Sequence, residues 1–465
     1  IIEKTRENLL NAASPKYLFA PQISVGGRQV AVREVDNFQD SNEDCINLCL
    51  TTTQGLHSAL NNPKENALTY DDFGKYSLVM ISDEAHHINS ATKRGRAAQP
   101  GGGSAATGQG ATETEDWEST VNRIFNTPHD SPLPNVLLEF TATEDLGNPL
   151  IAAKYLGKVI FDYPLKEFRK DGYSKDIEVV QSDLPPVDRA MQAVVLSQYK
   201  RKLFASIGQD IKPVVMLKSK TIADNKAFYE LFVQAVRRLQ TADLRRMAGR
   251  AKGDMAAAFS FFAEKGVSAD NLLLELREDF KEANLLLIDG NNISAEKQIK
   301  LNTLEAHDNE VRAVFAVDML NEGWDVLNLF DIVRLYETRD ARGGKPGKTT
   351  MQEAQLIGRG ARYMPFSSPD GTLPRGQRKY DNDTANRLRT VEKLHYHSSH
   401  NPRYVQELHT ALVETGIVAE SARELTLLLK DSFKATEFYQ KGIVFSNTRV
   451  PCGTDDDGAS FGEPI

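Results

Sequence analysis

The chain has 465 residues, of which 40% are hydrophobic and 26% are charged. These proportions are close to those of soluble globular proteins, so they exclude a fibrous class and a wholly disordered class. The length predicts about two or three domains, and the formal net charge of -8 does not by itself indicate a nucleic-acid binder.

Six short runs of β-branched residues or leucine, each ending in small or polar residues, predict buried parallel strands. In chain order, these runs cover residues 76–82, 135–140, 213–217, 285–288, 311–317 and 332–336. Amphipathic stretches between them, such as residues 223–239 and 351–358, predict helices. This alternation is typical of open α/β sheets, whose ligands bind at the carboxyl ends of the strands.

Two stretches depart from this alternation. Residues 97–114 are rich in Gly, Ala, Ser and Thr without periodicity, which predicts a mobile surface loop. A phosphate-binding loop is the alternative, but the stretch lacks Gly-Lys-Ser/Thr and does not directly follow a strand. Residues 237–280 contain no strand-like run and predict a helical insertion.

The location of the protein can be predicted from what the chain lacks. No apolar run approaches the roughly 18 to 20 residues of a membrane helix, so we expect no membrane segment. The three cysteines are an odd number and accompany no secretory signal, which favours reduced thiols and a cytoplasmic location. Because the first residues include no initiator methionine, we expect the chain to begin inside a larger protein.

The strongest local signal is the predicted strand at residues 76–82, which runs into Asp83, Glu84, Ala85 and His86. A carboxylate at the end of a buried strand can bind a hydrated Mg²⁺ beside nucleotide phosphates, and its neighbour can polarise the attacking water. Asp83 would have the first role and Glu84 the second. The alternative is an ordinary helix N-terminus, where acidic residues are also favoured.

A second signal is the run Gln-Leu-Ile-Gly-Arg-Gly-Ala-Arg at residues 355–362. Since Arg359 and Arg362 are three residues apart, we expect both to lie on one face of a helix. Guanidinium groups suit the charge that spreads over a phosphoryl group during transfer. An exposed basic helix is the alternative, because residues 334–403 contain twice as many basic as acidic side chains.

These two segments resemble motifs II and VI of superfamily-two helicases, and three further segments resemble the intervening motifs in the same order. The matching positions are Thr141 and Thr143 for motif III, Lys218 and Ser219 for motif IV, Gly323 and Asp325 for motif V, and Gln355, Gly358, Arg359 and Arg362 for motif VI. The resemblance implies two RecA-like lobes with parallel sheets, ATP and Mg²⁺ at their cleft, and nucleic acid across their tops.

The resemblance also implies a role for each position. Asp83 would bind Mg²⁺ through water, Glu84 would activate water, and Gln355 would contact nucleotide or water. Arg359 and Arg362 would clamp the γ-phosphate from the opposite lobe. Further nucleotide contacts are implied at Gly323, Asp325 and Gly358. Contacts to nucleic acid, or coupling between the two sites, are implied at His86, Thr141, Thr143, Lys218 and Ser219.

Four segments resemble one branch of this superfamily more closely, the restriction (Res) subunit of type III restriction enzymes. They cover residues 115–118, 137–143, 171–176 and 356–363. The resemblance implies a motor that hydrolyses ATP to move along or signal over double-stranded DNA in phage defence. It also implies a methyltransferase (Mod) subunit as the partner that reads the DNA sequence.

Three features depart from the pattern or look like further sites. The sequence has no P-loop, which the family places N-terminal to the start of this chain, and Gly347, Lys348 and Thr349 read as a basic loop instead. No Asp or Glu after Asp370 has the Lys two positions on that a PD-(D/E)xK nuclease needs, so we expect no cleavage. Residues 392–397 resemble a helical segment of the family, which favours packing or a DNA-facing role over a metal site.

We therefore predict a first lobe at residues 1–185, a second lobe at residues 186–416 with the insertion, and a short C-terminal extension at residues 417–465. The predicted activity is that of an ATP-dependent DNA translocase or helicase, weak in a chain that lacks the P-loop. Two alternatives stay open. One is a non-catalytic DNA-binding or scaffold module, and the other is an RNA helicase, since such lobes contact the backbone rather than the bases.

Overall fold

The computed structural model describes residues 2–418, except 15–16, 21, 62–67, 89–109, 142–148, 164, 289–293, 318–325, 339–345, 364–375 and 384, and also residues 436, 437 and 439. The chain divides into two units, Ile1–Val418 and Ala419–Ile465, and all elements named below lie in the first. No helix among the described residues is both long and apolar enough to cross a bilayer.

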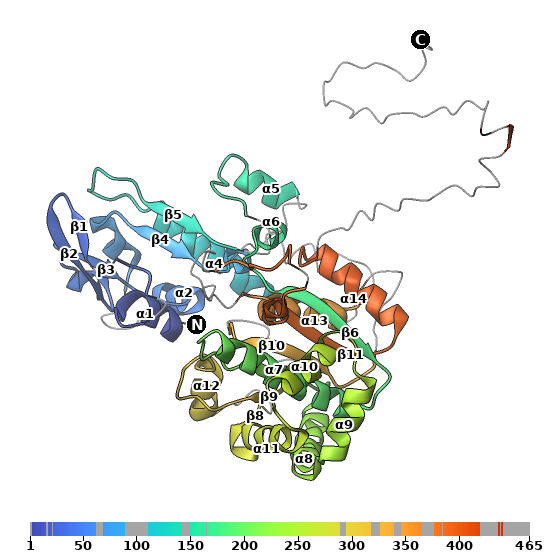
Figure 1. Ribbon diagram of the computed structural model, residues 1–465. Coiled ribbons are helices and arrows are strands. Elements are labelled where there is room, and N and C mark those ends of the chain that lie inside the picture. The colour runs from blue at the N-terminus through green and yellow to red at the C-terminus, as the bar shows by residue number, and fades with distance from the viewer. Residues whose placement is uncertain are drawn as a thin grey trace. The chain divides into compact units, whose positions relative to one another are not determined.

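The N-terminal part of the first unit contains two small sheets (Figure 1). The first follows helix α1 (Ile2–Leu10) and consists of β1 (Ile23–Val25), β2 (Arg28–Glu34) and β3 (Cys45–Leu48). The second consists of the parallel strands β4 (Val79–Ser82) and β5 (Val136–Glu139). The helical elements of this part are α2 (Thr53–Asn61), η3 (Ala85–His87), α4 (Gly110–Phe125), α5 (Pro149–Tyr155) and α6 (Leu165–Lys170).

The two faces of the β4–β5 sheet differ. Met80 packs against a small core of Leu60, Phe73, Leu78 and Ile124 on one face. On the other face, the side chains of Val79 and Ile81 are 65% and 68% exposed. Parallel strands are usually covered on both faces, so this apolar surface is an unusual feature of the first unit.

The remainder of the first unit is a six-stranded parallel sheet with the strand order β6-β11-β10-β7-β9-β8. Its strands are β6 (Asp176–Ser182), β7 (Val214–Lys218), β8 (Leu285–Leu287), β9 (Ala313–Ala316), β10 (Leu329–Arg334) and β11 (Lys393–Ser399). Its helices are α7 (Pro186–Ser206), α8 (Ile222–Arg238), α9 (Thr241–Arg250), α10 (Gly253–Glu264), α11 (Ala269–Asp279), α12 (Ala295–Asn302), α13 (Lys348–Gly360) and α14 (Pro402–Glu414).

Apolar residues of the central strands enter two opposite cores, which explains why these strands are largely apolar on both faces. In β10, Phe330 and Val333 belong to the core that α7, α8, α10 and α11 cover. Leu329 and Ile332 of the same strand belong to the core beneath α13 and α14. Because side chains alternate along a strand, a sheet with two covered faces needs apolar residues at every position.

The predicted α/β class with parallel sheets is confirmed. Each of the six predicted strands is present, with ends shifted by a few residues, and helices α9, α10 and α11 occupy the predicted insertion. Five strands that no apolar run predicted are also present: β1, β2, β3, β6 and β11.

Several sequence-based boundaries are wrong. Strand β6 pairs with β11 in the six-stranded sheet, although a boundary at residue 185 assigned it to the first lobe. Residues 393–397 form part of strand β11 rather than a helix. Helix α4 begins at Gly110, inside the expected loop, whose other residues lie outside the described ranges.

Candidate active site

The two carboxylates of motif II lie directly after strand β4. Asp83 and Glu84 are both exposed, and the Glu84 amide donates to Asp83 Oδ1 at 2.9 Å. Glu84 has a φ of 51° and is the one non-glycine residue with a positive φ among the described residues. A left-handed conformation at a non-glycine residue costs energy and occurs more often at functional sites. The backbone therefore turns sharply at the residue predicted to activate water.

His86 joins motif II to the segment after strand β5. Its Nδ1 lies 2.9 Å from Thr141 Oγ1 and 3.4 Å from Glu84 Oε2. The Ala85 amide also donates to the Phe140 carbonyl at 3.0 Å. The structure thus brings together His86 and Thr141, two positions predicted to couple the nucleotide and nucleic-acid sites. Thr143 lies outside the described residues.

Lys218 and Ser219 lie at the carboxyl end of strand β7, but both are almost completely buried. The backbone there is part of the sheet, since the Ser219 amide donates to the Ala316 carbonyl at 3.0 Å. Lys220 follows them and is exposed, with its Nζ 2.9 Å from Thr338 Oγ1. Of the basic residues at this strand end, the accessible one is therefore Lys220, which the motif comparison did not select.

The motif V positions Gly323 and Asp325 lie outside the described residues, which resume at Val326. The motif VI positions lie on and just after α13. Gln355 is exposed, and Gly358 and Arg359 are half-buried. The expectation of one shared helical face is wrong for Arg362, because α13 ends at Gly360 and Arg362 forms an antiparallel bridge with Ser174.

Gly358 has a packing role that its motif position did not reveal. A Cβ atom at Gly358 would come within 2.8 Å of Ile417 Cδ1. Gly360 is similarly close to a neighbour, because a Cβ there would meet Leu329 Cδ2 at 3.0 Å. The two glycines therefore let α13 approach the following chain on one side and the sheet on the other.

A buried ion pair fixes the middle of α13 to strand β10. Arg334 Nε lies 2.8 Å from Glu353 Oε1, and both side chains are at most 2% exposed. Tyr336 and Tyr404 donate their hydroxyls to the same carboxylate. Burial alone would lower the pKa of Arg334, but Glu353 raises it on balance. The signal in the sequence was an arginine inside an apolar strand, since buried charges are nearly always paired.

The N-terminus of α13 is already bonded to a carboxylate. Gly347, Lys348 and Thr349 were expected to form a basic loop, but Gly347 caps the helix and the other two begin it. The Gly347 amide donates to Glu407 Oε1 at 2.9 Å, and the Thr350 hydroxyl donates to the same oxygen at 2.7 Å. Glu407 therefore takes the position that an anion would take at this helix end.

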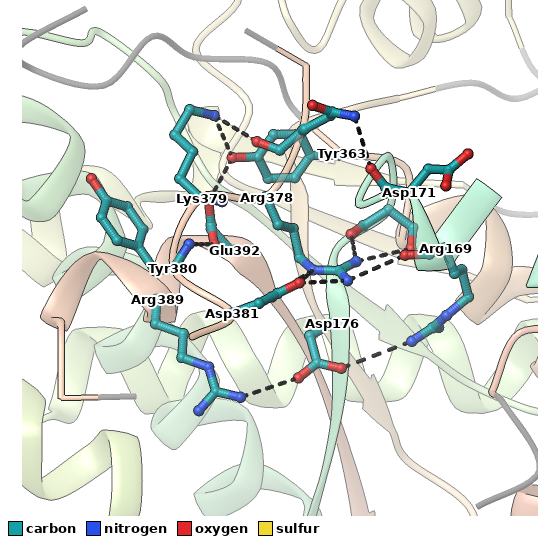
Figure 2. A network of polar contacts seen from close by, with 12 residues as sticks. Arg169, Asp171, Asp176, Tyr363, Arg378, Lys379, Tyr380, Asp381, Arg389 and Glu392 are labelled. Carbon is teal, nitrogen blue, oxygen red and sulfur yellow. Dashed lines mark hydrogen bonds and ion pairs between the residues drawn. The ribbon is translucent and has the colours of Figure 1, made fainter. Parts of the chain in front are cut away.

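A polar network holds residues 169–176 against the chain that follows motif VI (Figure 2). Arg378 donates to the carbonyls of Ser174 and Arg169 and pairs with Asp381 at 2.9 Å. Tyr363 donates to Glu392 at 2.8 Å. The segment that precedes β6 is therefore held by the chain that follows Arg362.

One cluster has the composition of a metal site. Glu178, Asp254 and His395 place ligand atoms close together in the described part of the chain. Lys393 Nζ, however, lies 2.6 Å from Glu178 Oε2 and 3.0 Å from Asp254 Oδ2. The Lys393 ammonium group therefore already pairs with both carboxylates, and the packing or DNA-facing role expected for residues 392–397 remains a prediction.

Comparisons with known proteins agree with the motifs. The family model described as "Type III restriction enzyme, res subunit" matches residues 1–145, and a model of the N-terminal region of HI_1054 matches residues 349–421. The probable type III restriction-modification enzyme HindVIP Res subunit of Haemophilus influenzae is 32% identical over 375 residues, which are 75% of this chain and 73% of that protein. An uncharacterised protein of the same organism is 35% identical over 106 residues, 22% of this chain and 23% of that protein.

Solved structures were also compared. S. cerevisiae Dbp5 bound to RNA and ADP BeF3 matches with a TM-score of 0.37 and 11% identity, covering 83% of this chain and 68% of that chain. A DEAD box protein from Methanococcus jannaschii matches with a TM-score of 0.29 and 12% identity, covering 84% of this chain and 71% of that chain.

Proposed function

Because this chain belongs to the family of Res subunits of type III restriction enzymes, we propose that it is the ATP-dependent DNA translocase or helicase motor of such an enzyme. The observation that carries the proposal is the arrangement of motif II. Asp83 and Glu84 follow a parallel strand at its carboxyl end, and His86 is hydrogen-bonded to Thr141 on the next segment. Ligands of open α/β sheets bind at such strand ends.

The residues at this strand end fit a divalent metal. Oxygen atoms such as those of carboxylates are the ligands that Mg²⁺ prefers, and the exposed side chain of Asp83 directly follows strand β4. When bound with ATP, Mg²⁺ would neutralise charge on the phosphates. Asp83 would hold the metal through water, and Glu84 would orient the attacking water. Gln355, Arg359 and Arg362 would contact the nucleotide, the two arginines stabilising the charge of the transferring phosphoryl group.

We further propose that the protein moves along double-stranded DNA and that its partner is a methyltransferase (Mod) subunit. We also propose that it is located in the cytoplasm and acts in phage defence. Membership in the Res-subunit family supports all four. Thr141 and Lys220 are both exposed, and we propose them as groups that contact the DNA.

The test is ATP hydrolysis by the complete protein that carries this chain, with double-stranded DNA, single-stranded DNA or RNA as activator. We expect double-stranded DNA to raise the rate and removal of Mg²⁺ by a chelator to abolish it. Glu84→Gln should lower kcat by about a hundredfold or more, because general bases contribute about 10² to 10⁴. Glu43→Gln is the control, since Glu43 is an exposed acidic residue outside the motifs.

Three results would contradict the proposal. A Glu84→Gln protein with full activity would exclude the assigned base. Stronger activation by RNA than by DNA would favour an RNA helicase. If the complete protein neither hydrolyses ATP nor contains an upstream Gly-Lys-Thr or Gly-Lys-Ser, the chain is a non-catalytic DNA-binding or scaffold module.

A further inference from the structure

Lys175 is a fully buried lysine whose ammonium group is surrounded by backbone carbonyls. Its Nζ donates to the carbonyl oxygens of Leu327 and Leu329 at 2.7 and 2.8 Å. It also donates to the carbonyl oxygens of Gly360 and Arg362 at 3.0 and 2.8 Å. Leu327 lies two residues before strand β10 and Leu329 is the first residue of that strand, and the other two carbonyls belong to the end of motif VI.

The chemistry of these partners requires a cation with several donors. A protonated lysine has three N–H donors and no acceptor, so two of the four carbonyls share one N–H, whereas a neutral amine would direct its lone pair at a carbonyl oxygen. Lys175 Nζ also lies 4.5 Å from the centre of the Phe330 ring, a favourable cation–π distance. Burial lowers the pKa of Lys175 well below its ordinary value, and the carbonyl dipoles oppose that effect.

The backbone around Lys175 is joined to the same segment. The Lys175 amide donates to the Ala361 carbonyl at 2.5 Å, and the Tyr363 amide donates to the Tyr173 carbonyl at 3.3 Å. Ser174 and Arg362 form an antiparallel bridge. The side chain of Lys175 and the main chain of residues 173–175 therefore both hold residues 360–363.

These contacts begin directly after Arg359 and include Arg362, the two motif VI arginines. Arg359 directly precedes Gly360, and Arg362 supplies one of the four carbonyls itself. Arg362 lies beyond the end of α13, so the helical hydrogen bonds do not determine its orientation. Without Lys175, the carbonyls of residues 360 and 362 would lose their shared donor in the interior, which destabilises this arrangement of the backbone.

We infer that Lys175 is a positioning residue for Arg359 and Arg362: it fixes the backbone that directly follows Arg359, and the backbone of Arg362 itself, against strand β10, so that their guanidinium groups are preorganised for phosphoryl transfer. The inference rests on the proposed function, because it presumes that these arginines act on the nucleotide. Preorganised groups avoid reorganisation during the reaction, and a misplacement of about 1 Å can cost about a hundredfold in rate.

The experiment compares variants of the complete protein by DNA-stimulated ATP hydrolysis, with kcat and KM for ATP measured separately. Lys175→Met keeps the length and apolar part of the side chain and removes the donors. We expect kcat to fall about tenfold to a hundredfold while KM for ATP and DNA affinity change less than about threefold. Arg359→Ala and Arg362→Ala are measured in parallel, and each is combined with Lys175→Met.

The matched control removes another fully buried lysine, Lys200, which lies on helix α7 and reaches strand β10. Lys200 Nζ bonds to the Phe330 carbonyl at 2.9 Å and to Asp331 Oδ2 at 2.8 Å, and both of these partners belong to strand β10 rather than to motif VI. Lys200→Met combined with Asp331→Asn removes this pair without leaving a lone charge. We expect it to lower stability while leaving kcat per folded molecule unchanged.

Hydrogen exchange of the amides at residues 359–363 gives a readout that does not depend on activity. Lys175→Met should accelerate exchange there, and the control variant should not. If Lys175→Met does not fold, Lys175→Gln retains two N–H donors on a shorter side chain and should give an intermediate kcat.

The outcomes separate the two claims. If the arginine variants lose activity but Lys175→Met has a normal kcat, the positioning role is wrong and the proposed function stands. If the arginine variants keep full activity, the proposed function itself fails at motif VI. If Lys175→Met lowers kcat as far in the arginine variants as in the normal protein, the effect does not pass through the arginines and the inference is overturned.

Discussion

His86 Nδ1 lies 2.9 Å from Thr141 Oγ1, so, beside the backbone bond from Ala85 to Phe140, a side-chain hydrogen bond joins the segment after β4 to the segment after β5. Because His86 also lies 3.4 Å from Glu84 Oε2, this bond connects the proposed catalytic carboxylate to Thr141. Thr141 is exposed and can therefore contact a ligand directly. Under the proposed function, the pair would be a short physical path by which DNA binding affects ATP hydrolysis.

Replacement of Thr141 by valine should weaken this coupling. Thr141→Val removes the hydroxyl, and a hydrogen bond contributes about 1 kcal/mol, so the ratio of DNA-stimulated to basal ATPase should fall about fivefold. His86→Ala should have the same effect, and the double variant should be no worse than either single one. Thr410→Val on α14 is the control, since its hydroxyl bonds within its own helix. Additive losses in the double variant would exclude coupling through this bond.

Removal of Glu353 should destabilise the protein strongly. Glu353→Ala leaves Arg334 buried without its carboxylate partner, and breaking a buried pair in this way costs about 3–5 kcal/mol. Urea unfolding measures the loss. The exposed pair of Arg237 and Glu282 is the control, since Glu282→Gln should cost about 1 kcal/mol or less. Equal losses in the two variants would show that the buried pair does not anchor α13.

Variants at the contact between Gly358 and Ile417 distinguish a packing role of Gly358 from a role in nucleotide binding. Gly358→Ala should cost about 1–3 kcal/mol, because its Cβ would come within 2.8 Å of Ile417 Cδ1. Ile417→Val removes that atom, so the double variant should recover most of the stability. Gly249→Ala is the control and should be neutral or stabilising, because nothing lies within 4 Å of its new methyl group.

The activity of the double variant then decides the role of Gly358. A stable Gly358→Ala, Ile417→Val protein with normal ATPase would show that the motif glycine is needed only for packing. A stable protein with reduced kcat or raised KM for ATP would show that Gly358 also lies against the nucleotide.

The strands and helices that the sequence predicted are those whose burial follows local patterns. Strands β7, β9 and β10 have apolar residues on both faces and therefore appear as continuous apolar runs. Strand β11 was missed because it buries His395 and His397, whose partners Asp254 and Asp331 come from α10 and β10. Pairs between residues this far apart in the chain cannot be predicted from a short stretch of sequence.

In the candidate site, too, the residues with a local sequence signal were predicted and those defined by distant contacts were not. Asp83, Glu84 and the arginines of motif VI were found because their types and spacing are local. Lys175 was not singled out, because a single lysine reads as a surface residue until the carbonyls at Leu327 and Gly360 are seen around it. Gly358 was assigned to the nucleotide, although its close neighbour in the structure is Ile417.

Asp331 should make the stability of the fold depend on pH in acid. Burial alone would raise the pKa of Asp331, but Lys200 at 2.8 Å and His397 at 3.1 Å lower it to about 2. The unfolded value is about 3.9, so the stability from ionised Asp331 is complete above about pH 4 and is lost as the pH falls through about 2. Unfolding free energies measured from pH 6 to pH 2 should therefore fall less steeply in Asp331→Asn. Asp308→Asn, at an exposed position, should leave the pH dependence unchanged. An Asp331→Asn protein with the original slope would place the acid-sensitive group elsewhere.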